Sequence, residues 1–148
     1  MSIGQLISNA NQYTGSAIAN LKFVETSINT GNIKEALGYF KIGIDELKRA
    51  IRTTKLIKEA YEKIRKPGKT DIGREIGSLI LDIEEGFRNG EKEILRSYIK
   101  MREGKMEECH SYLNIAFERD LNDVQKRLEK LTELNIDIMS LVRAGFGT

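Results

Sequence analysis

The sequence has little proline and cysteine and no tryptophan: its 148 residues include one proline and one cysteine. Proline interrupts helices and marks many turns of β-rich folds, so its near absence argues against a sandwich or a barrel. The lone Cys109 has no partner for an internal disulfide, which favours a reducing, cytoplasmic location. No basic segment followed by an apolar one opens the chain, and no apolar run reaches the roughly 18 to 20 residues of a membrane span. We therefore expect a cytoplasmic, helical protein without a membrane span.

Charge of neither sign dominates. The 24 Lys and Arg residues nearly balance the 22 Asp and Glu residues, which leaves a formal net charge of +2. A balanced chain has no overall attraction for nucleic acid or anionic lipid. Binding of either would therefore need a local basic patch.

Apolar residues recur at helical spacing through almost the whole chain. In residues 3–28 they step alternately by four and three, which places them on one helix face: Ile3, Ile7, Ala10, Thr14, Ala17, Leu21, Val24 and Ile28. A second helix is expected from Asn32 to Pro67-Gly68, a third from Thr70 and a fourth after Gly104. The inward residues predicted for the first part of the second helix are Ile33, Leu37, Phe40, Ile44, Leu47 and Ile51. The third helix is left open to a break near Asn89-Gly90.

Four long helices joined by turns of a few residues must alternate in direction, because a short turn makes neighbouring helices antiparallel. The length is that of one domain. The sequence therefore predicts an all-α fold, an antiparallel up-down-up-down four-helix bundle that occupies residues 1–148 as a single domain.

The second half of the chain resembles the first at an offset of 73 residues. Residues 31–45 align with 104–118, with identical Gly, Glu, Tyr and Ile residues and with small residues opposite small ones. We interpret the bundle as a duplicated helical hairpin, with repeats over 17–66 and 90–139. The alternative is that two amphipathic helices that each follow a glycine have been matched by chance.

The stretch from Thr30 to Phe40, with Ile44 after it, carries Gly, an acid, Ala, an aliphatic residue and aromatics in the order Thr-Gly-Asn-Ile-Lys-Glu-Ala-Leu-Gly-Tyr-Phe. It resembles the hairpin turn of tetratricopeptide repeats, and it is similar to the hairpin of MIT domains, which are small three-helix interaction modules. The resemblance covers about residues 17–52, with a weaker echo over 90–125. It implies binding of a partner helix.

Residues 1–21 contain no charged side chain, although 31% of the chain is charged. Gly15 and Ala19 form a small-xxx-small pair that lets another backbone come close. We interpret the chain as a non-enzymatic protein–protein interaction or assembly module that forms a homo-oligomer or binds a protein partner. The predicted contact residues are Ile3, Ile7, Ala10, Gly15 and Ala19. The alternative is a polar, uncharged face in solvent or a partly disordered leader.

A second hypothesis rests on basic residues. Nine Lys or Arg residues lie between Lys48 and Lys69, against two glutamates. Phosphate contacts need such cations on one face, so a small nucleic-acid-associated subunit would use Lys48, Arg52, Lys55 and Lys66. The alternative is an ordinary solvated surface whose cations complement the C-terminal end of a helix dipole.

Catalytic and metal-binding signals are weak. His110 and Glu107 form one Glu-x-x-His unit, whereas di-iron bundles use two such units. Cys109 and His110 are adjacent on a helix, so their side chains point about 100° apart and do not form a thiol–imidazole pair. We predict no catalytic residue, no metal and no cofactor.

Overall fold

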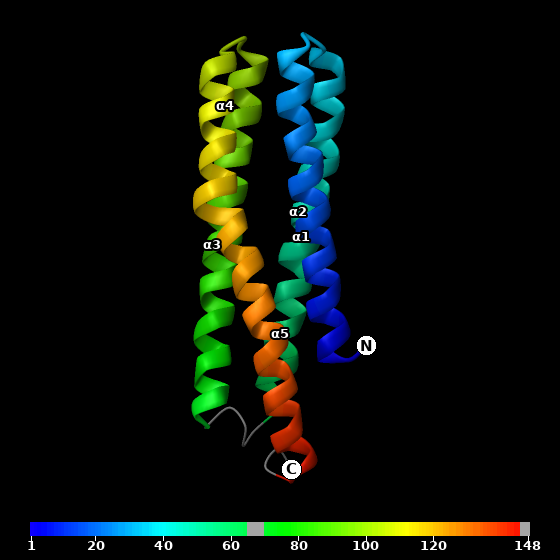
Figure 1. The fold of residues 1–148 in the computed structure, drawn as a ribbon, viewed down its shortest axis with the longest axis vertical. Helices are drawn as coiled ribbons and strands as arrows, with labels where there is room; N and C mark the ends of the chain where they lie inside the picture. The colour runs from blue at the N-terminus through cyan, green and yellow to red at the C-terminus, as the bar shows by residue number, and fades with distance from the viewer. Residues whose placement is uncertain (65–69, 146–148) are drawn as a thin grey trace.

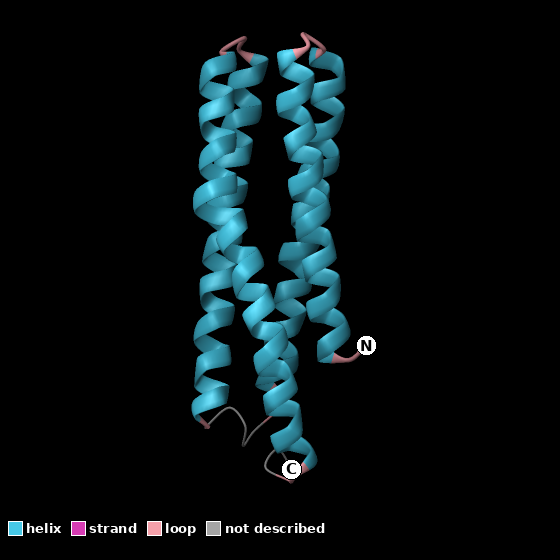
Figure 2. Cartoon of the chain, in the orientation of Figure 1, coloured by secondary structure: helices cyan, strands magenta, loops and turns pink. Residues whose placement is uncertain are grey.

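The computed structural model describes residues 1–64 and 70–145, which are almost entirely helical (Figure 2). The elements are α1 (Ile3–Asn29), α2 (Ile33–Glu62), α3 (Asp71–Arg102), α4 (Met106–Ile115), the π-helical turn η2 (Ala116–Leu121) and α5 (Asn122–Arg143). The last three follow one another without a break and form the fourth rod of the bundle. The predicted all-α four-helix bundle is confirmed, while the predicted end of the second helix at Pro67-Gly68 lies outside the described residues.

Side chains cap the helices where the sequence places their starts. Asn32 accepts a hydrogen bond from the backbone N–H of Glu35 at 3.1 Å, and Thr70 accepts one from that of Gly73 at 3.0 Å. Each bond satisfies a backbone donor that has no partner inside the helix. The predicted starts of α2 and α3 are therefore confirmed.

The turns before α2 and α4 have the same geometry. Gly31 and Gly104 have φ of +76° and +80°, a region that glycine enters without a steric penalty. In each turn the residue after the glycine donates its backbone N–H to the carbonyl five positions earlier. Helices that end on a glycine often share this pattern, so the duplicated hairpin stays a prediction.

Figure 1 shows how the four rods are arranged. α1 lies against α2, and α4 lies against α3. Beyond η2 the fourth rod slants across the bundle, so that α5 contacts α1 as well as α3. The buried apolar side chains of all the rods form one continuous core. Within the described ranges no helix is both long and apolar enough to cross a bilayer.

The two helices of the first hairpin approach closely. The predicted stripe of α1 is buried from Ile7 to Ile28, and only Ile3 is partly exposed. On α2 the centre of the buried face is shifted from the predicted one, because Ala36 and Ala50 are buried completely and Gly43 is buried as well. The larger residues predicted to point inward lie at its edge or outside it: Ile33, Leu37, Ile44 and Ile51. A Cβ added at Gly43 would lie 2.7 Å from Cγ of Leu21, so this contact needs glycine.

The third helix continues through Asn89-Gly90, so the break left open there does not occur. A Cβ at Gly86 would lie 2.5 Å from Cγ2 of Val124, and one at Gly90 would lie 3.0 Å from Cδ2 of Leu121. The glycines thus let the fourth rod pack closely against α3. Their role is packing rather than helix termination.

The turn η2 takes up one extra residue. Before η2, each buried residue of the fourth rod lies 73 positions after a buried residue of α2. After η2 the difference is 74 positions, as it is between Ala50 and Val124 and between Ile57 and Leu131. A π-helical turn closes its hydrogen bonds over five residues instead of four, so it holds one more residue than an α-helical turn. Sequence periodicity did not reveal this turn.

Candidate functional site

The residues predicted for self-association do not all lie on the surface. Ile7 and Ala10 are buried in the bundle's own core, at 1% and 0% exposure, and Ile3 is partly buried. Gly15 is also partly buried, since its side faces Gln125 of α5. Only Ala19 is exposed. A partner would therefore meet the opposite face of α1, because the bundle itself already covers the apolar stripe.

That opposite face is uncharged over most of its length. Its exposed residues recur at helical spacing, and we call them the outer strip: Gln5, Ser8, Gln12, Ala19 and Phe23. The first charged side chain of α1 is Lys22, more than halfway along the helix. The outer strip is therefore a polar, neutral surface on a protein whose other helices are rich in Lys and Glu.

The outer strip ends at an aromatic pair in which Phe23 is exposed and Tyr39 is partly buried. The ring of Phe23 stacks on that of Tyr39 from α2, with 5.1 Å between centroids and 29° between planes. Phe23 nevertheless remains 51% exposed. Farther along the same hairpin, Tyr13 and Leu56 line a groove between α1 and α2, together with Arg49, Arg52 and Thr53. The α1–α2 hairpin therefore presents aromatic and aliphatic surface next to the outer strip.

Three of the four predicted basic residues share one face of α2. Lys48, Arg52 and Lys55 follow one another at intervals of four and three and are all exposed. None of them forms an ion pair within the described part of the chain. Lys66 lies outside the described residues. The structure thus brings together three cations on one exposed face.

Buried charged residues cluster at η2, a feature that the sequence analysis did not predict. Asp120 and Glu93 are only 4% and 5% exposed. Arg119 donates hydrogen bonds to both carboxylate oxygens of Asp120, at 2.9 and 3.1 Å. The carboxylate of Glu93 lies 2.8 Å from the guanidinium of Arg96 and 3.8 Å from that of Arg119. The hydrogen bonds with Asp120 raise the pKa of Arg119 above its usual range. Both carboxylates already pair with arginines, so this cluster fits a structural role at the π-helical turn.

Cys109 and His110 point to different partners. The buried thiol of Cys109 lies 3.2 Å from Oγ of Ser97, and burial raises the pKa of this thiol. Nδ1 of His110 lies 3.7 Å from a carboxylate oxygen of Glu25 on α1, while Glu107 is exposed. Across residues 1–64 and 70–145 no three or more His, Cys, Asp or Glu residues are grouped so that they could hold a metal ion.

Comparison with known proteins adds no relative. No family model, no curated protein and no solved structure matches this chain. The resemblance to tetratricopeptide and MIT hairpins therefore rests on the residues around Gly31 alone.

Proposed function

We propose that the protein is a non-enzymatic helical assembly module that self-associates through the outer strip of α1. The observation that carries this proposal is the absence of charged side chains from the exposed face of α1 as far as Lys22. Elsewhere the surface carries the charges that make up 31% of the chain.

A second copy of the chain is the occupant that suits this face. In a two-fold dimer the same surface meets itself, so any charge would meet a like charge. A neutral strip avoids that repulsion, and its amide and hydroxyl groups can both donate and accept hydrogen bonds. Small residues such as Ser8 and Ala19 let two backbones come close.

The size of a stable interface indicates how far the contact must extend. About 800 Å² per partner is usual, whereas one face of a 20-residue helix, roughly 30 Å long and 10 Å wide, supplies about 300 Å². The contact would therefore continue past Phe23 onto the edge of α2, where Tyr39 is partly buried and Leu56 is exposed. Aromatic residues at such positions often dominate binding energy.

Inserting a charge into the outer strip tests this proposal. We expect Ala19→Glu to weaken dimerisation by about tenfold or more, because each copy would bring a carboxylate against its equivalent. Sedimentation velocity over a concentration series measures the change. The matched control is Asn114→Glu, which places the same charge on an exposed site of α4. Equal effects of the two substitutions would contradict a contact through α1.

A second candidate function is supported by three cations of α2 that form no ion pair with any other described residue. Lys48, Arg52 and Lys55 would meet the phosphates of a nucleic acid along one helix face. The test is binding of short DNA and RNA duplexes at low salt. Reversal of charge at Arg52 and Lys55 to Glu should abolish that binding, and binding that survives the reversal would refute this candidate.

A further inference from the structure

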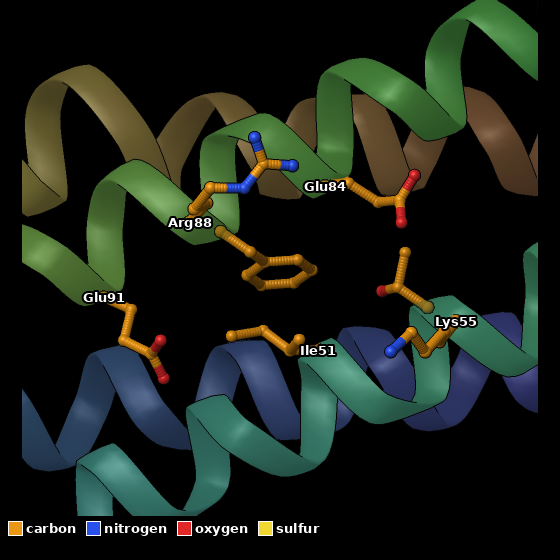
Figure 3. A pocket seen from close by; sticks show the side chains of 7 residues that line it. Ile51, Lys55, Glu84, Arg88 and Glu91 are labelled. Atoms are coloured by element: carbon orange, nitrogen blue, oxygen red, sulfur yellow. The ribbon is translucent and has the colours of Figure 1, made fainter.

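A small cavity of about 150 Å³ opens between α2 and α3 (Figure 3). Its base is apolar: Phe87 and Thr54 are 1% exposed and Ile51 is half-buried. The hydroxyl of Thr54 donates its hydrogen bond to the carbonyl of Ala50 at 2.9 Å. A cavity of this volume accepts an apolar group about the size of benzene. The base therefore fits a compact side chain of four to six carbons or so.

The rim carries charges of both signs. Glu84 and Glu91 lie at opposite ends of the cavity, Arg88 lies between them on α3, and Lys55 comes from the facing helix α2 (Figure 3). Glu84 already contacts Lys58 at 3.3 Å. In the described part of the chain, no ion pair engages Lys55, Arg88 or Glu91. Two cations and one carboxylate therefore line an apolar cavity and form no ion pair with the residues that the structure describes.

We propose that this cavity binds a small zwitterion, an α-amino acid with a compact apolar side chain such as leucine. The side chain would fill the base, the carboxylate would meet Arg88, and the ammonium group would meet Glu91, about one helical turn further along α3. Hydrogen bonds between ionised groups are the strong ones, and a zwitterion satisfies both signs of the rim. A ligand with a single charge leaves one sign unmatched. This inference stands independently of self-association through α1.

Three probes test the need for both charges. Isothermal titration calorimetry on the full chain compares L-leucine with 4-methylpentanoate, which lacks the ammonium group, and 3-methylbutylamine, which lacks the carboxylate. We expect saturable binding of leucine and affinities about tenfold weaker for each half-probe, because each loses one charged contact. Absence of saturable leucine binding, or a half-probe that binds as tightly as leucine, would overturn the proposal.

Single substitutions locate the site. Glu91→Gln should weaken leucine binding by about tenfold and leave 4-methylpentanoate unaffected, whereas Arg88→Gln should weaken both. Glu85→Gln and Lys92→Gln are matched controls, because both residues are exposed on α3 and lie outside the cavity lining. All four sites are at or near the surface, so folding should be retained. If the controls weaken binding as much as the cavity variants do, leucine binds elsewhere and the assignment fails.

Discussion

At the scale of single residues, the absence of a side chain sets how closely two helices pack. Gly43 faces Leu21, and Gly86 and Gly90 face residues of the fourth rod. In the first hairpin the glycine lies on α2, and in the second hairpin the two glycines lie on α3. A methyl group at these crossings would have to displace a core side chain or separate the helices.

Two glycines of α2 make a matched pair for testing this role. Gly43→Ala should lower the free energy of unfolding by about 1–3 kcal/mol, because its Cβ would overlap the buried Leu21. Gly38→Ala should raise it by about 0.5–1 kcal/mol, since Gly38 is exposed inside the same helix with nothing within 4 Å of an added Cβ. Chemical denaturation measures both. Two changes of the same sign would contradict the proposed close packing.

Tyr61 makes stability depend on alkaline pH. Its hydroxyl donates a hydrogen bond to Oδ1 of Asn135, which ties α2 to α5, and burial raises its pKa above the usual range. In the unfolded chain a tyrosine loses its proton near pH 10 or so. Above that pH the folded state binds more protons than the unfolded state, so stability falls as pH rises, by up to about 1.4 kcal/mol per pH unit.

Tyr61→Phe removes both the hydrogen bond and this titration. At pH 8 the variant should be less stable than the parent by about 1 kcal/mol, the usual net contribution of a hydrogen bond. The difference should shrink as pH rises past about 10, because only the parent then loses the contribution of Tyr61. Guanidinium unfolding of the parent and the variant at pH 8 and at a pH above about 10 measures the difference in stability. An equal difference at both pH values would contradict the proposed role of Tyr61.

At the scale of elements, η2 keeps the fourth rod in register with the core. The stripe of buried residues steps by five from Ala116 to Leu121, where α2 steps by four from Gly43 to Leu47. The widened turn holds the additional residue, so the residues of α5 still point inward.

Deleting Glu118, an exposed residue of η2, should convert the turn into ordinary α-helix and leave the buried face of α5 unchanged. We expect cooperative thermal unfolding with a midpoint within several degrees of the parent. Deleting Glu129, which is exposed in the middle of α5, should instead rotate every later residue by about 100° and remove the C-terminal half of that helix from the core. Circular dichroism melts compare the two, and equal damage would show that η2 does not absorb the extra residue.

At the scale of the whole molecule, the bundle follows from local signals. Glycines at 31 and 104 mark two short turns, Asn32 and Thr70 cap the helices that follow them in the chain, and a short turn between long helices makes those helices antiparallel. The buried face of α2 could not be predicted as well, because Ala36 and Gly43 are weakly hydrophobic and their burial depends on how closely α1 approaches. The extra residue of η2 becomes visible only when the two hairpins are compared.

The candidate surfaces, too, could be predicted only in part from the sequence. The missing charge in residues 1–21 selects the segment, but it does not say which face is exposed, and Ile7 and Ala10 belong to the core. The α2–α3 cavity draws on two ordinary amphipathic segments whose facing residues are set by the packing of the bundle. No spacing in the sequence pairs Lys55 with Arg88.

The most direct test of self-association through α1 is sedimentation equilibrium of the unmodified chain over a wide range of concentrations. Self-association through a neutral face predicts a mass that rises from 16.8 kDa towards twice that value and changes little with salt. A mass of one chain at every concentration would contradict it, and so would an assembly that dissociates steeply as salt is added.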